Sequence, residues 1–207
     1  MTIHILDVAV FFMKIKKWEA AVIIGFAIAL ALASPLSVQA AVAEKMTRLH
    51  VVANSDSEED QLLKLKVRDA VLDASVGHDT LSDSLLEQME QAAQQCVYDN
   101  GYDYPVTVER GEMWFDTRDY DGFSLAAGTY DAVKVRIGDA AGKNWWCVIF
   151  PPLCAAVSER ELEHTAARAG LSSRELSFIS KDGNVCVLGF KLAELWGKLQ
   201  KLVEKRK

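Results

Sequence analysis

Two cysteines in one apolar stretch are the first residues to consider for chemistry. Cys147 and Cys154 are separated by six residues, whereas zinc ligands usually stand two to four residues apart. A cysteine nucleophile would need a histidine and an orienting group. None of His50, His78 and His164 stands in a recognisable catalytic context. We therefore predict no catalytic residue.

Three aspartates offer the ligand type that calcium prefers. Asp116, Asp119 and Asp121 fall in a segment that mixes aromatic and charged residues, and exported acidic loops can bind calcium through such oxygens. The spacing lacks the glycine and the distant glutamate of an EF-hand loop. The chain also has no glycine-rich phosphate loop, no His-Glu-x-x-His and no Gly-x-Ser-x-Gly motif. The residue types therefore predict neither a metal nor a cofactor.

A polar block is the other stretch whose composition needs an explanation. It opens with Asn54-Ser55-Asp56, residue types that end strands and cap helices. Three charged residues then stand at positions i, i+4 and i+8 on one side of a predicted helix, namely Asp60, Lys64 and Arg68. Such a row is typical of a solvated, charge-paired face, and it would also suit a surface that contacts a partner. Helical periodicity does not separate the two interpretations.

Composition and charge limit the class of protein that positions these residues. The chain has 207 residues, of which 50% are hydrophobic and 25% are charged, which is typical of a globular protein with one domain and short appendages. The formal charge is −6. Because nucleic-acid-binding proteins usually carry a basic patch or stripe, this charge argues against a nucleic-acid partner.

The first forty residues have the three parts of a secretory signal peptide. Basic residues between Lys14 and Lys17 precede an uncharged apolar run, and Val38-Gln39-Ala40 supplies short residues before a cut. We therefore predict a signal peptide over residues 1–40. Residues 1–12 would be an over-called start, because Met13 begins a signal peptide of normal form.

An uncleaved membrane anchor is the competing interpretation of this segment. No charge occurs between Ala20 and Ala43, a run of 24 residues that is long enough to span a bilayer. Ser34, Pro35 and Gln39 make its second half a poor membrane span. Both interpretations place the rest of the chain outside the cytoplasm, where cysteines are candidate disulfide partners.

Strand and helix patterns predict the fold class. Segments with the residue types of strands are Thr47–Ala53, Tyr104–Glu109, Thr129–Ile137 and Asn144–Phe150. Amphipathic helices are expected over about 58–74, capped by Ser57, and about 81–97, capped by Ser82 or Thr80. The expected fold is α+β: a small antiparallel sheet with these two helices packed on one face, an N-terminal signal helix and a C-terminal amphipathic helix.

The stretch Asn144–Cys154 is expected at the centre of that sheet. A glycine-bounded connection of hairpin length precedes it, so we expect the strand Asn144–Phe150 to pair antiparallel with Thr129–Ile137. Prolines cannot donate to a sheet ladder and therefore end the strand. The residues of this structural motif are Asn144, Trp145, Trp146, Pro151 and Pro152. In an exported chain a Cys147–Cys154 disulfide is predicted, and Cys186 is the alternative partner of either cysteine.

The predicted organisation places a secreted α+β domain at residues 41–157 and a helical C-terminal extension at residues 158–207. The last helix, from about Gly189, carries six basic and two acidic side chains on its exposed side, a net charge of +4. A basic amphipathic helix can lie on an anionic membrane surface. Packing on the domain core is the equally open alternative.

Two blocks of the chain resemble a known family. The first is Leu49–Gln61 with its continuation Leu65–Val71, and the second is Ala127–Tyr130 followed by Gly142–Cys154. Both are long and unusual in composition, and together they look like the signature of stage II sporulation protein R. The resemblance covers roughly residues 48–154, and the last fifty residues carry little of the pattern.

This resemblance implies a secreted signal of endospore-forming bacteria. Members of the family cross from the forespore into the space between the forespore and mother-cell membranes. There a membrane-embedded aspartic protease of the mother cell requires them to process pro-sigma-E. By this resemblance the chain activates that protease and is not an enzyme. The alternative is an exported cell-wall hydrolase or another cysteine-dependent enzyme.

The resemblance does not supply contact residues, so we take them from the polar block, because folding alone does not require so polar a stretch. The predicted partner-binding residues are Asn54, Ser55, Asp56, Asp60, Gln61, Lys64 and Arg68.

Overall fold

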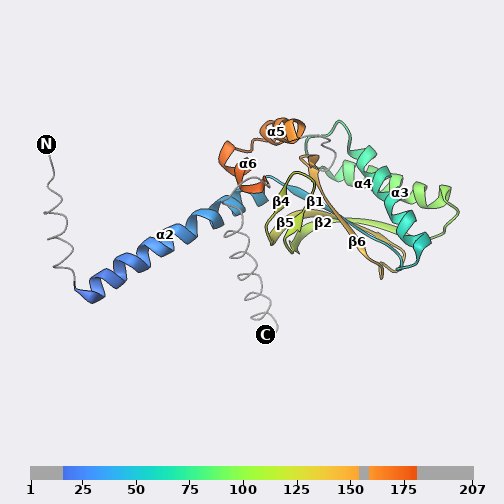
Figure 1. Cartoon of the computed structure of the whole chain (residues 1–207). Coiled ribbons are helices and arrows are strands. Elements are labelled where there is room, and N and C mark those ends of the chain that lie inside the picture. Colours follow the sequence, from blue (N-terminus) through green and yellow to red (C-terminus); the bar gives the residue numbers. More distant parts are fainter. Residues whose placement is uncertain (1–15, 154–158, 181–207) are drawn as a thin grey trace.

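The computed structural model describes residues 16–153 and 159–180, with helices along a curved sheet and at one end of it (Figure 1). The helices are α2 (Lys17–Glu44), α3 (Glu58–Ser75), α4 (Asp83–Asp99), α5 (Glu159–Arg168) and α6 (Ser173–Ile179). The strands are β1 (Thr47–Val52), β2 (Val106–Phe115), β3 (Arg118–Asp119), β4 (Ser124–Leu125), β5 (Gly128–Ile137) and β6 (Asn144–Phe150). The helix predicted from about Gly189 lies outside the described residues, as do Cys154 and Cys186.

Four strands form one sheet in the order β2-β5-β1-β6, and β3 pairs with β4 in a separate ribbon. β1 is parallel to β5 and antiparallel to β6, while β2 is antiparallel to β5. The α+β class is confirmed, but the sheet is mixed and not antiparallel throughout. β5 and β6 are not neighbours, and β6 lies at an edge. The predictions that Asn144–Phe150 is central and pairs with Thr129–Ile137 are therefore wrong.

Burial explains why β1 separates these two strands. Every residue from Arg48 to Val52 is buried, on both faces of the strand. A strand of this kind needs cover on both faces, and the centre of a sheet provides it. Since neighbouring strands lie about 4.8 Å apart, the loop between β5 and β6 spans about 10 Å across the end of β1. The loop between β5 and β6 therefore has the length of a hairpin connection, but it crosses the end of β1.

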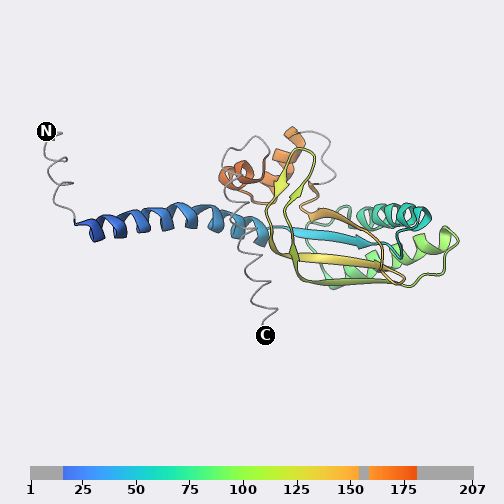
Figure 2. The ribbon, with the colours of Figure 1, turned by 60° about the horizontal axis from the view of Figure 1, so that its bottom comes forward.

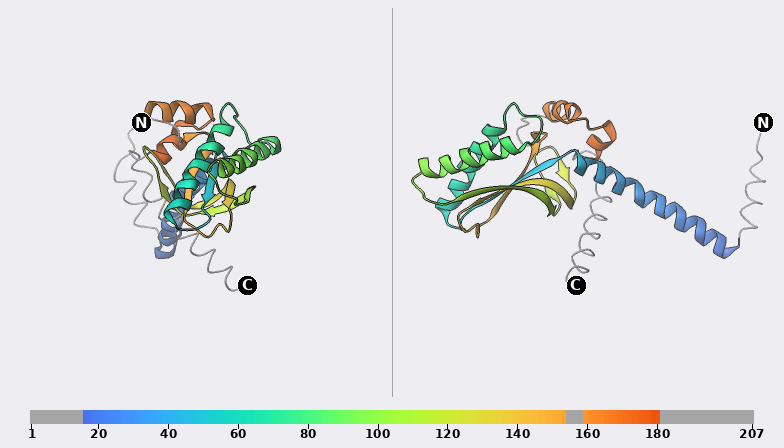
Figure 3. Two further views of the ribbon diagram at one scale, coloured as in Figure 1. Left: turned by 90° about the vertical axis from the view of Figure 1, so that its right-hand side faces the viewer. Right: turned by 180° about the vertical axis from the view of Figure 1, so that it is seen from behind.

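We call the face of the sheet that α3 and α4 cover the first face, and the opposite one the second face. The local predictions for the first face are confirmed. α3 and α4 pack together on this face (Figure 3). Ser57 accepts the backbone N–H of Asp60, and Ser82 accepts that of Leu85, both at 3.2 Å, as expected of N-cap residues. The helices fill the core on this face with Leu63, Val67, Val71, Leu85, Met89, Ala93 and Val97.

Part of the second face is covered by the end of α2, by α5 and α6, and by the β3–β4 ribbon (Figure 2). The core there includes Val38, Val42, Met46, Phe115, Phe123, Leu125, Tyr130, Leu162, Ala166, Phe178 and Ile179. Residues 159–180, which the sequence places in a C-terminal extension, therefore share a core with the sheet. The region 111–128, which has no clear period, forms the end of β2 and the ribbon.

α2 is continuous through Ala40 and projects away from the sheet (Figure 2). Within the described ranges, we find no helix that combines the length and the apolar character needed to cross a bilayer. Cleavage after Ala40 and anchoring both stay predictions.

One ion pair connects α2 to α6. Lys45 follows α2, and its Nζ lies 2.8 Å from both carboxylate oxygens of Glu175. The backbone N–H of Ser172 donates to the same carboxylate at 2.6 Å. These hydrogen bonds, with that of Lys45 the strongest, lower the pKa of the buried Glu175 from 4.5 to about 2.

Glu175→Gln should therefore reduce the free energy of unfolding by about 1–2 kcal/mol at pH 7, a range that allows for the partial exposure of Lys45. The folded pKa lies below the unfolded one, so this contribution is complete above about pH 4.5 and is lost as the pH falls towards 2. Urea unfolding at pH 7 and at pH 3 measures it. Glu163→Gln, at an exposed position of α5, is the control. Equal losses for the two variants at pH 7 would contradict the assignment.

Candidate functional site

The two signature blocks meet at one end of the sheet. The turn between β1 and α3 lies against the loop between β5 and β6. Two backbone hydrogen bonds of 3.0 Å join them, from the N–H of Gly142 to the C=O of Ala53 and from the N–H of Ala141 to the C=O of Asn54. We call this contact the turn–loop junction. Blocks that lie almost ninety residues apart in sequence thus form one structural unit.

Side chains of the turn also bind the backbone of the loop. Asn54 Oδ1 accepts the N–H of Asp139 at 3.0 Å, and Asp56 Oδ1 accepts the N–H of Lys143 at 2.7 Å. Loop amides need a partner wherever strands do not supply one. The polar residues of the turn meet this need.

Two glycines of the loop allow the close approach. A Cβ on Gly138 would collide with the side chain of Asn54, and one on Gly142 would collide with the backbone C=O of Ser55. Gly138 also has a φ of +55°, a conformation that other residues rarely adopt. The glycine-bounded sequence of the loop therefore has a steric cause at both positions.

Asp60, in the first turn of α3, lies at the centre of the hydrogen bonds that the turn makes. Only 4% of it is exposed, and its Oδ2 accepts Asn54 Nδ2 at 2.9 Å and Ser55 Oγ at 2.6 Å. Burial by itself would raise the pKa of Asp60, but interactions with Ser55, Asn54, Tyr104 and Ser57 outweigh burial and lower it. The carboxylate is therefore a buried, charged group that the turn itself solvates.

Gln61 and Lys64 extend this network along α3. Gln61 Nε2 donates to the C=O of Ser55 at 2.8 Å. Lys64 Nζ donates to Gln61 Oε1 at 2.6 Å and to the C=O of Lys143 at 3.1 Å. Lys64 is only 6% exposed, and burial lowers its pKa although Asp56 opposes the shift. Both side chains thus bind the turn and the loop from the first turns of the helix.

Arg68 has different neighbours. Its Nη2 lies 2.7 Å from Asp69 Oδ1, and its guanidinium carbon lies 5.0 Å from the centre of the Trp145 ring. In the described part of the chain no ion pair links Asp60, Lys64 and Arg68 to one another. The interpretation of this row as a solvated, charge-paired face is therefore wrong, because its first two members are buried against the junction.

The seven predicted partner-binding residues thus fall into three groups by exposure. Asp56 is exposed, Asn54, Ser55, Gln61 and Arg68 are partly exposed, and Asp60 and Lys64 are buried. Six of them build the junction, and Arg68 lies one turn further along α3. The structure supplies a folding reason for most of the block, and partner binding stays a prediction.

The β6 motif is divided between the two faces of the sheet. Trp145 lies under α3, while Trp146 on the second face stacks on His50, with ring centres 4.1 Å apart. The strand begins at Asn144 and ends before Pro151-Pro152, as predicted. Burial lowers the pKa of His50.

The cysteines have different environments. Cys96 on α4 is a free, half-buried thiol, and burial raises its pKa. Cys147 is buried in the first core. No disulfide joins two cysteines within the described ranges, and Cys154 lies outside them, so the Cys147–Cys154 bridge stays a prediction.

Sequence reasoning missed the buried Arg48. Its Nη2 donates to the hydroxyl of Tyr120 at 2.6 Å, and its guanidinium carbon lies 4.0 Å from the ring centre of Phe115 and 4.9 Å from that of Tyr130. Nε and Nη1 have no hydrogen-bond partner among the described residues. Burial lowers the pKa of Arg48, and Tyr120 and Tyr130 oppose the shift. A charged residue inside an apolar strand was the available signal.

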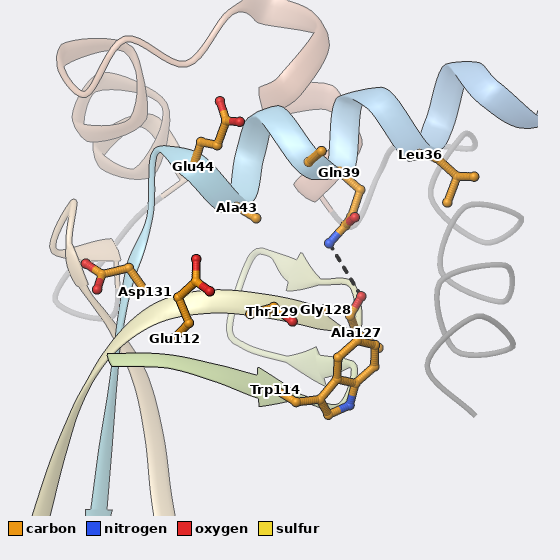
Figure 4. Close-up of a pocket in the computed structure, with 11 residues that line it drawn as sticks. Leu36, Gln39, Ala43, Glu44, Glu112, Trp114, Ala127, Gly128, Thr129 and Asp131 are labelled. Atoms are coloured by element: carbon orange, nitrogen blue, oxygen red, sulfur yellow. Dashed lines mark hydrogen bonds between the residues drawn. The ribbon is translucent and has the colours of Figure 1, made fainter. Parts of the chain in front are cut away.

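A pocket at the other end of β5 was also missed. It lies between the end of α2 and the sheet, where Glu112, Trp114 and Asp131 lie across from Gln39 and the residues near it (Figure 4). Gln39 Nε2 donates to the C=O of Ala127 at 3.5 Å. In the ranges 16–153 and 159–180, no three His, Cys, Asp or Glu side chains gather as a set of metal ligands.

These features define a class: a small α+β domain with a mixed sheet and a polar turn–loop junction. A family model described as stage II sporulation protein R (spore_II_R) matches residues 43–160. Stage II sporulation protein R of Bacillus subtilis (strain 168) is 31% identical over 169 residues, which cover 68% of this chain and 75% of that relative. No solved structure matches the chain. The chain belongs to the stage II sporulation protein R family and has a role in sporulation.

Gly142→Ala should test the junction. The new Cβ would collide with the C=O of Ser55, so we expect the free energy of unfolding to fall by about 1–3 kcal/mol. Gly111→Ala in β2 is the matched control, because its Cβ would meet no atom within 4 Å. Urea unfolding measures both variants. Equal stability of the two would show that the close contact is absent.

Proposed function

We propose that this chain is a secreted intercellular sporulation signal that activates a membrane-embedded aspartic protease to process pro-sigma-E. The observation that carries the proposal is the family match over residues 43–160, which contain the whole sheet, α3, α4 and the junction. The activity itself comes from the resemblance of the two signature blocks. In this function the chain contributes a surface and the protease contributes the chemistry.

The exposed residues of the junction and of α3 form the proposed contact surface. Asp56 lies at the tip of the turn, and Arg68 with Trp145 lies further along the helix. Rigid, partly exposed arginine and tryptophan side chains are the types that dominate binding energy in protein interfaces. Asp60 and Lys64 are too buried to contact a partner directly, so their proposed contribution is to hold the turn in the shape that presents Asp56.

Co-expression tests the function directly. The candidate protease and pro-sigma-E are produced with and without this chain, and cleavage of the precursor is scored. Cleavage only in the presence of the chain supports the proposal. Equal cleavage in both cultures would reject it.

Asp56→Ala combined with Arg68→Ala should abolish processing while secretion and folding are retained. Asp56 does not pack in the core, and the loss of its one hydrogen bond to Lys143 should reduce the free energy of unfolding by about 1 kcal/mol. Precursor cleavage and export of the variant are measured together. Asp73→Ala combined with Lys66→Ala, exposed positions on the same helix, is the control. Normal processing by the first variant would remove the proposed contact surface.

Export is part of the proposal. The signal segment would carry the chain across the forespore membrane into the intermembrane space, or anchor it there if the segment is not cleaved. The predicted basic helix from about Gly189 lies outside the described residues, and in this proposal it would add a peripheral membrane contact.

In this oxidising compartment we expect Cys147 and Cys154 to form a disulfide, whereas Cys96 stays reduced because its thiol is half-buried and its pKa is raised. Alkylation of the exported protein before and after reduction, followed by peptide mass spectrometry, identifies the pair. Free Cys147 and Cys154 with one of them unusually reactive would favour the alternative, a cysteine-dependent enzyme. A bridge from Cys147 to Cys186 would correct the connectivity.

A further inference from the structure

No helix or strand of the described residues covers the second face of the sheet near the junction. The strand registers place two rows of side chains side by side across this half of the face. One row is Glu109, Lys134, His50 and Trp146, and the next is Thr107, Arg136, Val52 and Asn144. We call these eight residues the open sheet face.

The outer residues of this face are accessible. Thr107, Glu109, Arg136 and Asn144 are exposed, and Lys134 and Trp146 are partly exposed. His50 and Val52 between them are buried, at 8% and 5% exposure, so the long side chains around them form a continuous floor. An unpaired sheet face of this kind is a surface on which a partner segment can lie.

Its charge differs from that of the whole chain. Lys134 and Arg136 stand in the middle, and Glu109 lies beside Lys134 at the edge strand. Arg118 adds a third cation at the border, with its guanidinium carbon 5.1 Å from the centre of the Trp146 ring. Three cations against one acid in a chain of net charge −6 give a local positive surface.

The aromatic part of the face is held rigidly. Trp146 is stacked on His50 with an angle of 19° between the ring planes. Phe115 is a second aromatic neighbour and meets Trp146 edge-on, with ring centres 5.1 Å apart. An indole fixed in this way offers an apolar contact at little cost in side-chain entropy.

We propose that the open sheet face binds an acidic segment of a partner protein, with carboxylates directed at Lys134 and Arg136 and an apolar side chain on Trp146. The two cations lie two residues apart on one strand, a separation of about 7 Å. Acidic side chains on one face of a bound strand or helix can match that spacing. The proposal rests on the proposed function only for the identity of the partner.

An anionic membrane is the other source of negative charge, and the structure disfavours it here. Membrane-surface binding needs apolar side chains that insert beside the cations. Outside α2, the large exposed apolar side chains of the described residues are Leu62, Val76 and Tyr98, which belong to α3, its C-terminal end and α4 on the first face. On the open sheet face, Trp146 is the one apolar side chain that is partly exposed, because Val52 is buried.

Binding of a decaglutamate peptide to the full chain in mild detergent tests the proposal by calorimetry at low salt. Lys134→Glu with Arg136→Glu should weaken binding about tenfold or more, and added salt should weaken binding to the unchanged protein. Lys66→Glu with Arg160→Glu, which changes the net charge equally at exposed positions elsewhere, should leave binding unchanged. Because reversal beside Glu109 can destabilise the sheet, Lys134→Gln with Arg136→Gln provides a second variant.

Equal peptide binding by all variants would overturn the proposal. Binding to vesicles of phosphatidylglycerol and phosphatidylcholine that is lost in the Lys134 and Arg136 variants, without peptide binding, would assign the face to lipid. The peptide measurement does not depend on pro-sigma-E processing, so a negative co-expression result would reject the proposed function and leave this surface in place.

Discussion

Removing the Asp60 carboxylate from water costs several kcal/mol unless the protein supplies hydrogen bonds, and the turn after β1 supplies them. Asn54 donates to this carboxylate and accepts from the loop between β5 and β6. The turn therefore has one shape, and the loop that it binds fixes where β6 begins. β1 can then lie between β5 and β6 with both of its faces buried. The start of β6 and the exposed tip at Asp56 both depend on this one solvated charge.

The second face of the sheet also contains a buried charge, and different groups replace water around it. Arg48 is buried among Phe115, Tyr120 and Tyr130, where ring faces and one hydroxyl replace water around the cation. Two of its nitrogens donate no hydrogen bond to the described residues, so buried polar groups on this face are less completely hydrogen-bonded than those of the junction. Aromatic packing then continues through Phe115 to Trp146, and it holds the border of the open sheet face in place. The two faces of one sheet thus differ in chemistry although they share β1.

Local features of the sequence predicted local structure well. The caps at Ser57 and Ser82, the apolar stripes of α3 and α4, and the proline stop after β6 depend only on neighbouring residues. The strand order could not be predicted from such features. Pairing depends on which strand is buried on both faces, whereas the alternation of apolar and polar residues describes one strand at a time. Helical spacing placed Asp60, Lys64 and Arg68 on one side of α3, but it carries no information about the loop that covers that side. Arg48 and its aromatic neighbours were missed because they are distributed over most of the domain.

The parallel pairing of β1 with β5 has a consequence for when the domain can fold during export. Thr47 and its sheet partner Asp131 are 84 residues apart, and the hydrogen bond from Lys143 to Asp56 spans 87 residues. For a chain that crosses a membrane N-terminus first, β1 emerges long before either of its neighbours. Contacts of such long range form slowly, and they cannot form at all until the later strands have emerged. If the chain is exported as proposed, the junction and any activity that depends on it would therefore appear only when nearly the whole domain has been delivered, and partly exported chains would be inactive.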